Sequence, residues 1–267
     1  MKLRRAKRFI QMGSLVGGMM MFLVAGQAHA LLIDTFDTDQ GPVIVETTST
    51  THDTTVTGGG VIGGEREMLV HCGTGCSNLK RIFGVVDNGV FSHSQDQGVT
   101  GYTVLTWDGT TGGDDALSVD ANTGFGDTDF TDGGSEIGLY YKIIDDDVNF
   151  DLTFTAYTDA GNYSNLVVSH SGPITDSNFV ALYSNFSTVA GLGVDFQHVR
   201  ALQLRIEASA PNLDMSFDFI RTTGGDDCVI DCNPNELPEP GTWILFGTGL
   251  IGVAGYGWRR NKGLTRI

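Results

Sequence analysis

Four cysteines are the side chains whose spacing bears most directly on chemistry. They form two close pairs, Cys72 with Cys76 and Cys228 with Cys232. An even number of cysteines in close pairs predicts disulfides in an exported chain, and the spacing leaves local and crossed pairing open. Zinc is the alternative, but two C-x3-C pairs are not a common ligand set, and redox-active pairs are more often C-x-x-C.

Aspartates supply a second type of ligand. Asp127, Asp129 and Asp132 precede Gly133 and Gly134. Calcium prefers carboxylates on flexible loops that contain glycine, so these three aspartates are candidate ligands of a structural calcium ion. The segment lacks the D-x-D-x-D-G register and the closing Glu of a calcium loop, and the alternative is that its aspartates shape turns.

Motifs for catalysis are missing from the sequence. It contains no H-E-x-x-H, G-x-S-x-G or G-x-x-x-x-G-K-[ST], and its histidines have no ligand spacing. A carboxylate pair for glycoside cleavage is defined by spatial separation, so the many acids carry no information about it. We therefore expect no enzyme and no catalytic residue, and a polysaccharide hydrolase is a further alternative.

Aromatic side chains favour sugar binding as the alternative function. We expect Tyr140 and Tyr157 to face outward on strands, with Trp107 and Tyr163 near strand ends. Sugar sites combine flat aromatic rings with planar polar groups. Together with the aspartates, this predicts a calcium-stabilised carbohydrate-binding module, unless the rings are simply packed or isolated.

Strands must position these residues. Apolar and polar residues alternate with period two in four segments, 136–143, 148–156, 202–208 and 213–219, which we expect to be central strands. In the last segment, Phe217 and Phe219 fall on the same buried face. The polar turns at 145–147 and 209–212 are consistent with antiparallel neighbours. Looser strands are expected at 31–36, 43–48, 67–71, 81–86, 99–107 and 116–119.

The expected fold is all-β, an antiparallel β-sandwich or jelly roll of ten to twelve strands. Helix formers are scarce, while β-branched and turn residues abound between 31 and 225. Strands at this spacing without helical patterns predict a sandwich. A parallel β-helix is the alternative, but the sequence has no fixed repeat period.

The N-terminus predicts export. Five basic residues, an apolar stretch and Ala28-His29-Ala30 describe a signal peptide over 1–30. Residues 1–30 hold five Lys/Arg and no acid, and 238–267 hold four Lys/Arg and one acid, which leaves seven basic and 31 acidic residues between them. That body, near −24, repels nucleic acid and anionic lipid.

The most specific pattern lies near the C-terminus, after a linker at 226–237 that carries the second cysteine pair. Pro238, Glu239 and Pro240 precede an apolar, glycine-rich run from Thr242 to Trp258. The prolines favour an extended, accessible recognition segment, and the run is marginal for a transmembrane helix. The basic residues Arg259, Arg260 and Lys262 would hold the tail in the cytoplasm.

This three-part pattern over 238–262 resembles the PEP-CTERM sorting domain of Gram-negative bacteria. The resemblance implies that Pro238, Glu239 and Pro240 are recognised by an exosortase, a membrane-embedded cysteine protease-transpeptidase that cleaves nearby. It also implies a precursor held in the inner membrane, then a protein of the cell surface or extracellular matrix, associated with exopolysaccharide and biofilm. Extracellular polysaccharide is the expected partner besides the exosortase. An ordinary tail anchor with a chance Pro-Glu-Pro is the alternative.

The sorting hypothesis predicts the behaviour of a double variant. Pro238→Ala with Glu239→Ala removes the recognition residues and leaves the apolar run and basic tail unchanged, so the chain should remain unprocessed in the membrane. Mass spectrometry and fractionation check this, and normal mass and release would contradict it.

Overall fold

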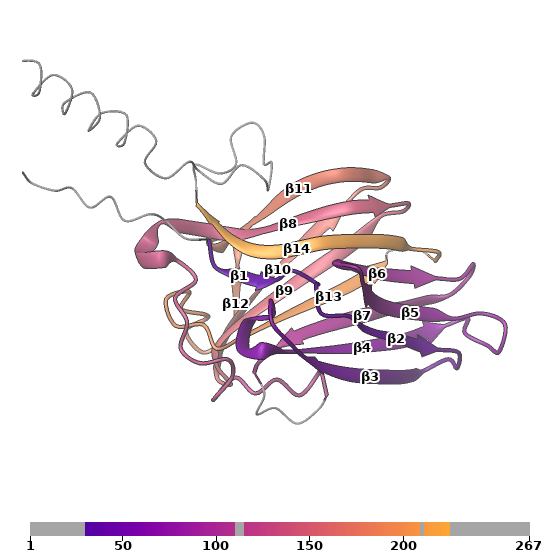
Figure 1. Cartoon of the computed structure of the whole chain (residues 1–267), viewed down its shortest axis with the longest axis horizontal. Coiled ribbons are helices and arrows are strands. Elements are labelled where there is room, and N and C mark those ends of the chain that lie inside the picture. Colours follow the sequence, from indigo (N-terminus) through magenta and orange to yellow (C-terminus); the bar gives the residue numbers. More distant parts are fainter. Residues whose placement is uncertain (1–29, 110–114, 209–210, 225–267) are drawn as a thin grey trace, which may run out of the picture.

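The computed structural model describes residues 30–109, 115–208 and 211–224, which form two facing antiparallel sheets (Figure 1). The strands are β1 Leu32–Asp34, β2 Gln40–Val45, β3 Thr50–Thr57, β4 Glu65–Thr74, β5 Ile82–Asp87, β6 Val90–Gln95, β7 Thr100–Trp107, β8 Glu136–Asp146, β9 Phe150–Asp159, β10 Asn162–His170, β11 Ile174–Leu182, β12 Ser187–Ala190, β13 Ala201–Ala208 and β14 Asp214–Gly224. Three short 3-10 turns are η1 Ile62–Gly64, η2 Asp132–Gly134 and η3 Tyr183–Asn185.

Each sheet has seven strands. The first sheet has the order β11-β8-β14-β6-β5-β2, with β1 beside β14, and the second has the order β12-β10-β9-β13-β7-β4-β3. The all-β sandwich is confirmed. The four segments with the clearest alternation, β8, β9, β13 and β14, are internal strands as expected.

Two turns were assigned the wrong role. Asp145 and Asp146 end β8, residues 147–149 connect it to β9, and the chain continues from β13 to β14, but in each case the two strands belong to different sheets. β8 pairs with β11 and β14, while β9 pairs with β10 and β13. Alternation shows which face of a strand is buried, but it does not identify the neighbouring strand. A short polar turn can therefore connect the two inner faces of a sandwich as well as form a hairpin.

Several strands were not predicted from the sequence. β3, β11 and β12 lie at sheet edges, where more of each strand is exposed and alternation is weaker. The sequence does contain a signal for β6, the dipeptide Asn88-Gly89, which is typical of a hairpin turn. These two residues form the two-residue turn between β5 and β6, with φ of 53° and 81°. The expected strand at 116–119 is a turn instead, where Ala116 packs on Leu69 of the second sheet.

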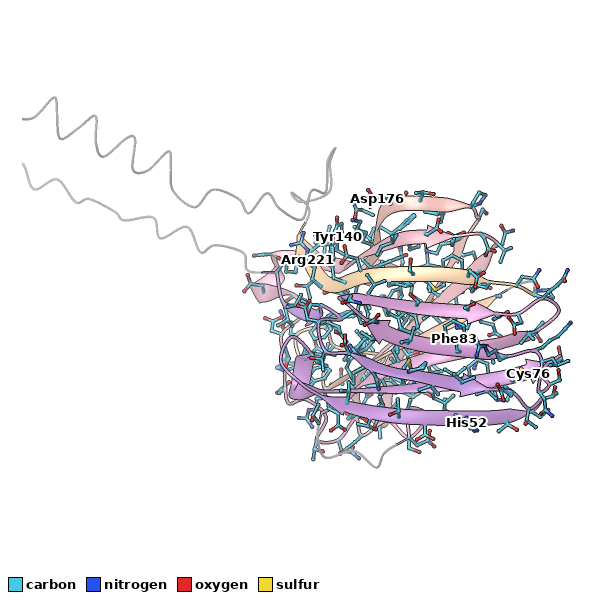
Figure 2. The ribbon with its side chains drawn as sticks, turned by 45° about the vertical axis from the view of Figure 1, so that its right-hand side comes forward. His52, Cys76, Phe83, Tyr140, Asp176 and Arg221 are labelled. Carbon is cyan, nitrogen blue, oxygen red and sulfur yellow. A yellow bond between two sulfur atoms is a disulfide. The ribbon has the colours of Figure 1, made fainter. Side chains whose placement is uncertain are left out.

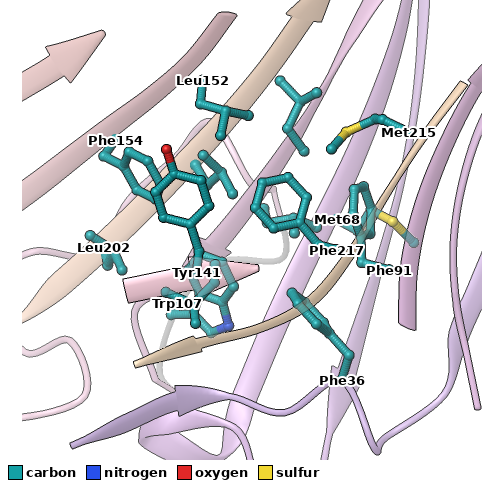
Figure 3. Close-up of a cluster of buried hydrophobic side chains, with 14 of the residues drawn as sticks. Phe36, Met68, Phe91, Trp107, Tyr141, Leu152, Phe154, Leu202, Met215 and Phe217 are labelled. Carbon is teal, nitrogen blue, oxygen red and sulfur yellow. The ribbon is translucent and has the colours of Figure 1, made fainter. Parts of the chain in front are cut away.

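The core lies between the sheets and is rich in aromatic rings. Figure 3 shows Trp107, Tyr141, Phe154 and Phe217 gathered there. The Tyr141 hydroxyl lies 3.0 Å from His170 Nε2. Burial lowers the pKa of His170 to about 4, so the imidazole is neutral at pH 7 and contributes to the core as a ring.

A buried ion pair joins the two sheets. Arg66 on β4 donates from Nη1 to both carboxylate oxygens of Asp34 on β1, at 3.0 and 2.9 Å, and both side chains are fully buried. Trp107 Nε1 donates to Asp34 Oδ2 at 2.8 Å, and the Phe36 amide donates to Oδ1 at 2.7 Å. Desolvation raises the pKa of Asp34, while the Arg66 charge and these donors oppose the rise.

The other nitrogens of the Arg66 guanidinium also have hydrogen-bond acceptors. Arg66 Nε donates to Gln40 Oε1 at 2.7 Å, and Nη2 donates to the Thr38 carbonyl at 2.6 Å. Gln40 in turn donates to the carbonyls of Thr54 and Arg66. The network therefore connects β1 and β2 of the first sheet to β3, β4 and β7 of the second.

Removing one member of this pair should be costly. Asp34→Asn leaves the Arg66 charge buried without its counter-charge, so the free energy of unfolding should fall by about 3–5 kcal/mol. Urea denaturation measures the change. The control is Glu207→Gln, which removes the half-exposed partner of Arg205 and should cost less than about 1 kcal/mol. Equal losses in the two variants would contradict the assigned role.

Candidate functional site

Strand β14 carries an irregularity that shapes the outer face of the first sheet. Its pairing with β8 advances from Phe217↔Ile143 to Ile220↔Tyr141, so Asp218 and Phe219 together oppose one residue of β8. This is a β-bulge, which breaks the alternation and locally bends the strand. Phe217 and Ile220 both remain buried, and Phe219 is turned to the outer face.

The opposite edge of β14 is shared by two strands. β6 pairs with Asp214–Phe217, and β1 pairs with Ile220 and Arg221. The bulge therefore lies where β1 replaces β6 as the neighbour of β14. A hollow of about 580 Å³ opens at this fork, within the ~300–1,000 Å³ typical of small-molecule sites. Its lining includes Leu32, Asp37, Asn88, Ile144, Phe219 and Arg221.

A tilted aromatic pair supports one wall of the hollow, with Phe219 in the lining and Tyr140 behind it. The rings of Phe219 and the fully buried Tyr140 lie 5.4 Å apart, and the Arg221 guanidinium lies 4.8 Å from the Tyr140 ring centre. Figure 2 shows Tyr140 and Arg221 together at one end of the sheet, away from Phe83. Arg221 makes no side-chain hydrogen bond or ion pair with any residue that the structure describes.

Carboxylates and a tight turn complete the lining. Asp218 lies 3.5 Å from Lys142 Nζ, which also pairs with Asp176 at 2.8 Å. The hydrogen bond to Asp176 is the main cause of the raised pKa of Lys142. Asn88, in the β5–β6 turn, is exposed beside Asp37 at the rim. Such a hollow can bind a ligand that presents an apolar face and several hydroxyl groups.

The expected exposure of Tyr140 is wrong, whereas the expected place of Trp107 near a strand end is confirmed. Tyr140 is fully buried beneath Phe219 and Arg221, and Trp107, the last residue of β7, is fully buried in the core. Tyr157 and Tyr163 are half-buried and form a pair with ring centres 5.0 Å apart on the second sheet. Tyr140 lies on β8 of the first sheet, so the structure does not bring the four rings together.

The residues of the hollow that the sequence did not indicate are Phe219 and Arg221. Strict alternation placed Phe219 on the buried face with Phe217, and the bulge reverses that assignment. No residue type in this segment marks the bulge. Only the pairing with Lys142 and its neighbours on β8 reveals it.

Two of the three aspartates expected to bind calcium make hydrogen bonds within the protein. Asp129 accepts hydrogen bonds from the Thr131 amide and hydroxyl and from the Gly133 amide, which lower its pKa. Asp127 Oδ1 lies 3.0 Å from His198 Nδ1. Across the described residues, no group of three or more His, Cys, Asp or Glu could hold a metal ion. Asp129 therefore shapes the turn and Asp127 ties it to His198, and calcium binding by Asp127, Asp129 and Asp132 stays a prediction.

The structure also pairs one set of cysteines. Cys72 on β4 and Cys76 form a disulfide, which is the local alternative for this pair. It closes the start of the β4–β5 connection. Cys228 and Cys232 lie outside the described residues.

Both terminal signals also lie outside the described residues. These are the signal peptide at 1–30, apart from its last residue, and the sorting segment with Pro238, Glu239, Pro240, Arg259, Arg260 and Lys262. In the part of the chain that the structure describes, no helix has the length and apolar character needed to cross a membrane.

Comparison with family models decides the role of the C-terminal segment. Residues 236–261 match the model described as the PEP-CTERM protein-sorting motif. This chain carries a PEP-CTERM sorting motif. The motif implies an exported, exosortase-processed protein of the cell surface. No curated protein matches the sequence.

Solved structures show remote likeness to the sandwich. A family 11 carbohydrate-binding module from Clostridium thermocellum, in complex with a β-1,3-1,4-mixed-linked tetrasaccharide, is 11% identical over 73% of this chain and 95% of its own, with a TM-score of 0.35. An exo-β-agarase is 14% identical over 73% of this chain and 25% of its own, with a TM-score of 0.35. An agarase is 8% identical over 54% and 22%, with a TM-score of 0.36. The fold assignment rests on the two sheets themselves.

The hydrogen bonds of Asp129 predict how the melting temperature responds to the removal of calcium. Because Asp129 is occupied by backbone and hydroxyl donors, the protein should melt at the same temperature in calcium and in chelator. Differential scanning fluorimetry measures both curves, with Asp129→Ala as a variant whose loss should be equal under the two conditions. A melting temperature that rises in calcium would contradict this prediction.

Proposed function

We propose that this PEP-CTERM protein is a non-catalytic component of the extracellular matrix, associated with exopolysaccharide in a biofilm. The sorting motif at 236–261 carries the proposal. An exosortase would separate the body from its basic tail and deliver it to the surface. The signal peptide and the motif then serve transport only, and the sandwich is the delivered product.

The charge of the body supports this function. With 31 acidic and seven basic residues between the two terminal signals, the released sandwich is repelled by nucleic acid and by anionic headgroups. Cleavage removes the basic tail, which is the segment suited to a cytoplasmic membrane surface. Both properties favour release from the membrane into a hydrated matrix.

The second candidate function is a carbohydrate-binding module that needs no calcium. The hollow at the β14 fork favours it, because the half-buried ring of Phe219 lies beside polar groups without hydrogen-bond partners among the described residues. The two functions are compatible, since a matrix protein is retained by binding the polymer around it.

Two measurements test the proposal: whether the mature protein cleaves polysaccharide, and whether it is retained in the matrix. The mature protein, purified after processing, should bind or mix with extracellular polysaccharide without shortening it, and reducing-end assays should remain at background. Cell fractionation should place the mature protein in the matrix. Release of reducing ends, or a mature form found only in the culture medium, would contradict the proposal.

A further inference from the structure

We infer that the hollow at the β14 fork binds a neutral pyranose unit of extracellular polysaccharide, with Phe219 as the stacking surface and Arg221, Asp37 and Asn88 as hydrogen-bonding partners. This inference rests on the proposed function and deepens it by assigning the site and the class of sugar. Phe219 and Arg221 lie on β14, whereas Asp37 and Asn88 lie on connections beside it.

The stacking surface is held in place before any ligand arrives. Phe219 is half-buried, and its ring packs on Tyr140, which is fully buried on the neighbouring strand. The bulge fixes its outward direction through backbone pairing on both sides, at Phe217 and Ile220. A ring held in this way loses little conformational entropy when a sugar stacks on it.

The polar groups match the chemistry of hydroxyl groups. Among the described residues, the side chains of Arg221, Asp37 and Asn88 have no hydrogen-bond partner. Arginine only donates, an ionised aspartate only accepts, and an asparagine amide does both. A sugar hydroxyl also does both, so neighbouring hydroxyls of a pyranose can use all three groups.

The charge of the body favours a neutral sugar. In the lining, Asp37 and Asp218 accompany the guanidinium of Arg221, and Lys142 Nζ lies 3.5 Å from Asp218 and compensates part of its charge. The surrounding body carries a large excess of acid, so it would repel a uronate or phosphate, most strongly within the Debye length of ~8 Å at physiological salt.

Other outer-face rings are less suited to this role. Tyr102 on the second sheet stacks with His71 at 4.6 Å, and Arg205 lies 3.6 Å from its ring centre. These two contacts occupy the ring. Phe83 on the first sheet has Arg81 at 5.7 Å, but it does not line the hollow. Phe83 is therefore a matched control for Phe219.

Affinity electrophoresis of the mature protein tests the site. Native gels would contain a neutral glucan, a neutral galactan, a neutral mannan or polygalacturonate. At least one neutral polymer should retard the protein, and polygalacturonate should not. Phe219→Ala should weaken that retardation by roughly ten-fold. Arg221→Lys, which keeps the charge and removes the planar fork of donors, should also weaken it.

Phe83→Ala should leave retardation unchanged, and melting curves should show that each variant is folded. Retardation by polygalacturonate alone, by no polymer, or equally in Phe219→Ala and the natural protein would overturn the inference. These results leave sorting and matrix localisation untouched. Those properties are measured by fractionation, so failure of this site and failure of the proposed function are distinguishable.

Discussion

The buried ion pair between Asp34 and Arg66 is the contact on which the arrangement of the sheets depends. Two charges removed from water are costly unless each is compensated, and here Trp107, Gln40 and backbone groups provide that compensation. The pair holds the short strand β1 against β14 while joining it to β4 of the opposite sheet. Because β1 forms one side of the fork, the outer hollow depends on a contact made in the interior.

The bulge in β14 gives the same strand two roles. Its inward side chains Phe217 and Ile220 fill the core, while the extra residue directs Phe219 outward over Tyr140. One inserted residue thus places an aromatic ring on the outer face of the sheet without opening the core. The neighbouring connections supply the polar rim. The site is therefore built mainly on strands, which hold their side chains more precisely than loops do.

Delivery and the proposed binding depend on separate parts of this chain. The PEP-CTERM motif occupies a contiguous segment at 236–261 and acts through local sequence, whereas the body acts through its folded surface. The strongly acidic composition serves both, since it keeps the released sandwich soluble and away from anionic membranes and polymers. Under the proposed function, a neutral polysaccharide is the partner with which such a surface is compatible.

The sequence by itself determined the features that depend on neighbouring residues. These were the sorting motif, the all-β class, and the internal strands β8, β9, β13 and β14, because period-two alternation reports burial directly. Tertiary structure alone decided which strands pair, that the connection at 147–149 crosses between the sheets, and where β14 bulges. Asp34 and Arg66 are 32 residues apart, and Asp37 meets Arg221 at one hollow. Such contacts arise from the packing of distant segments, and no local pattern of residue types encodes them.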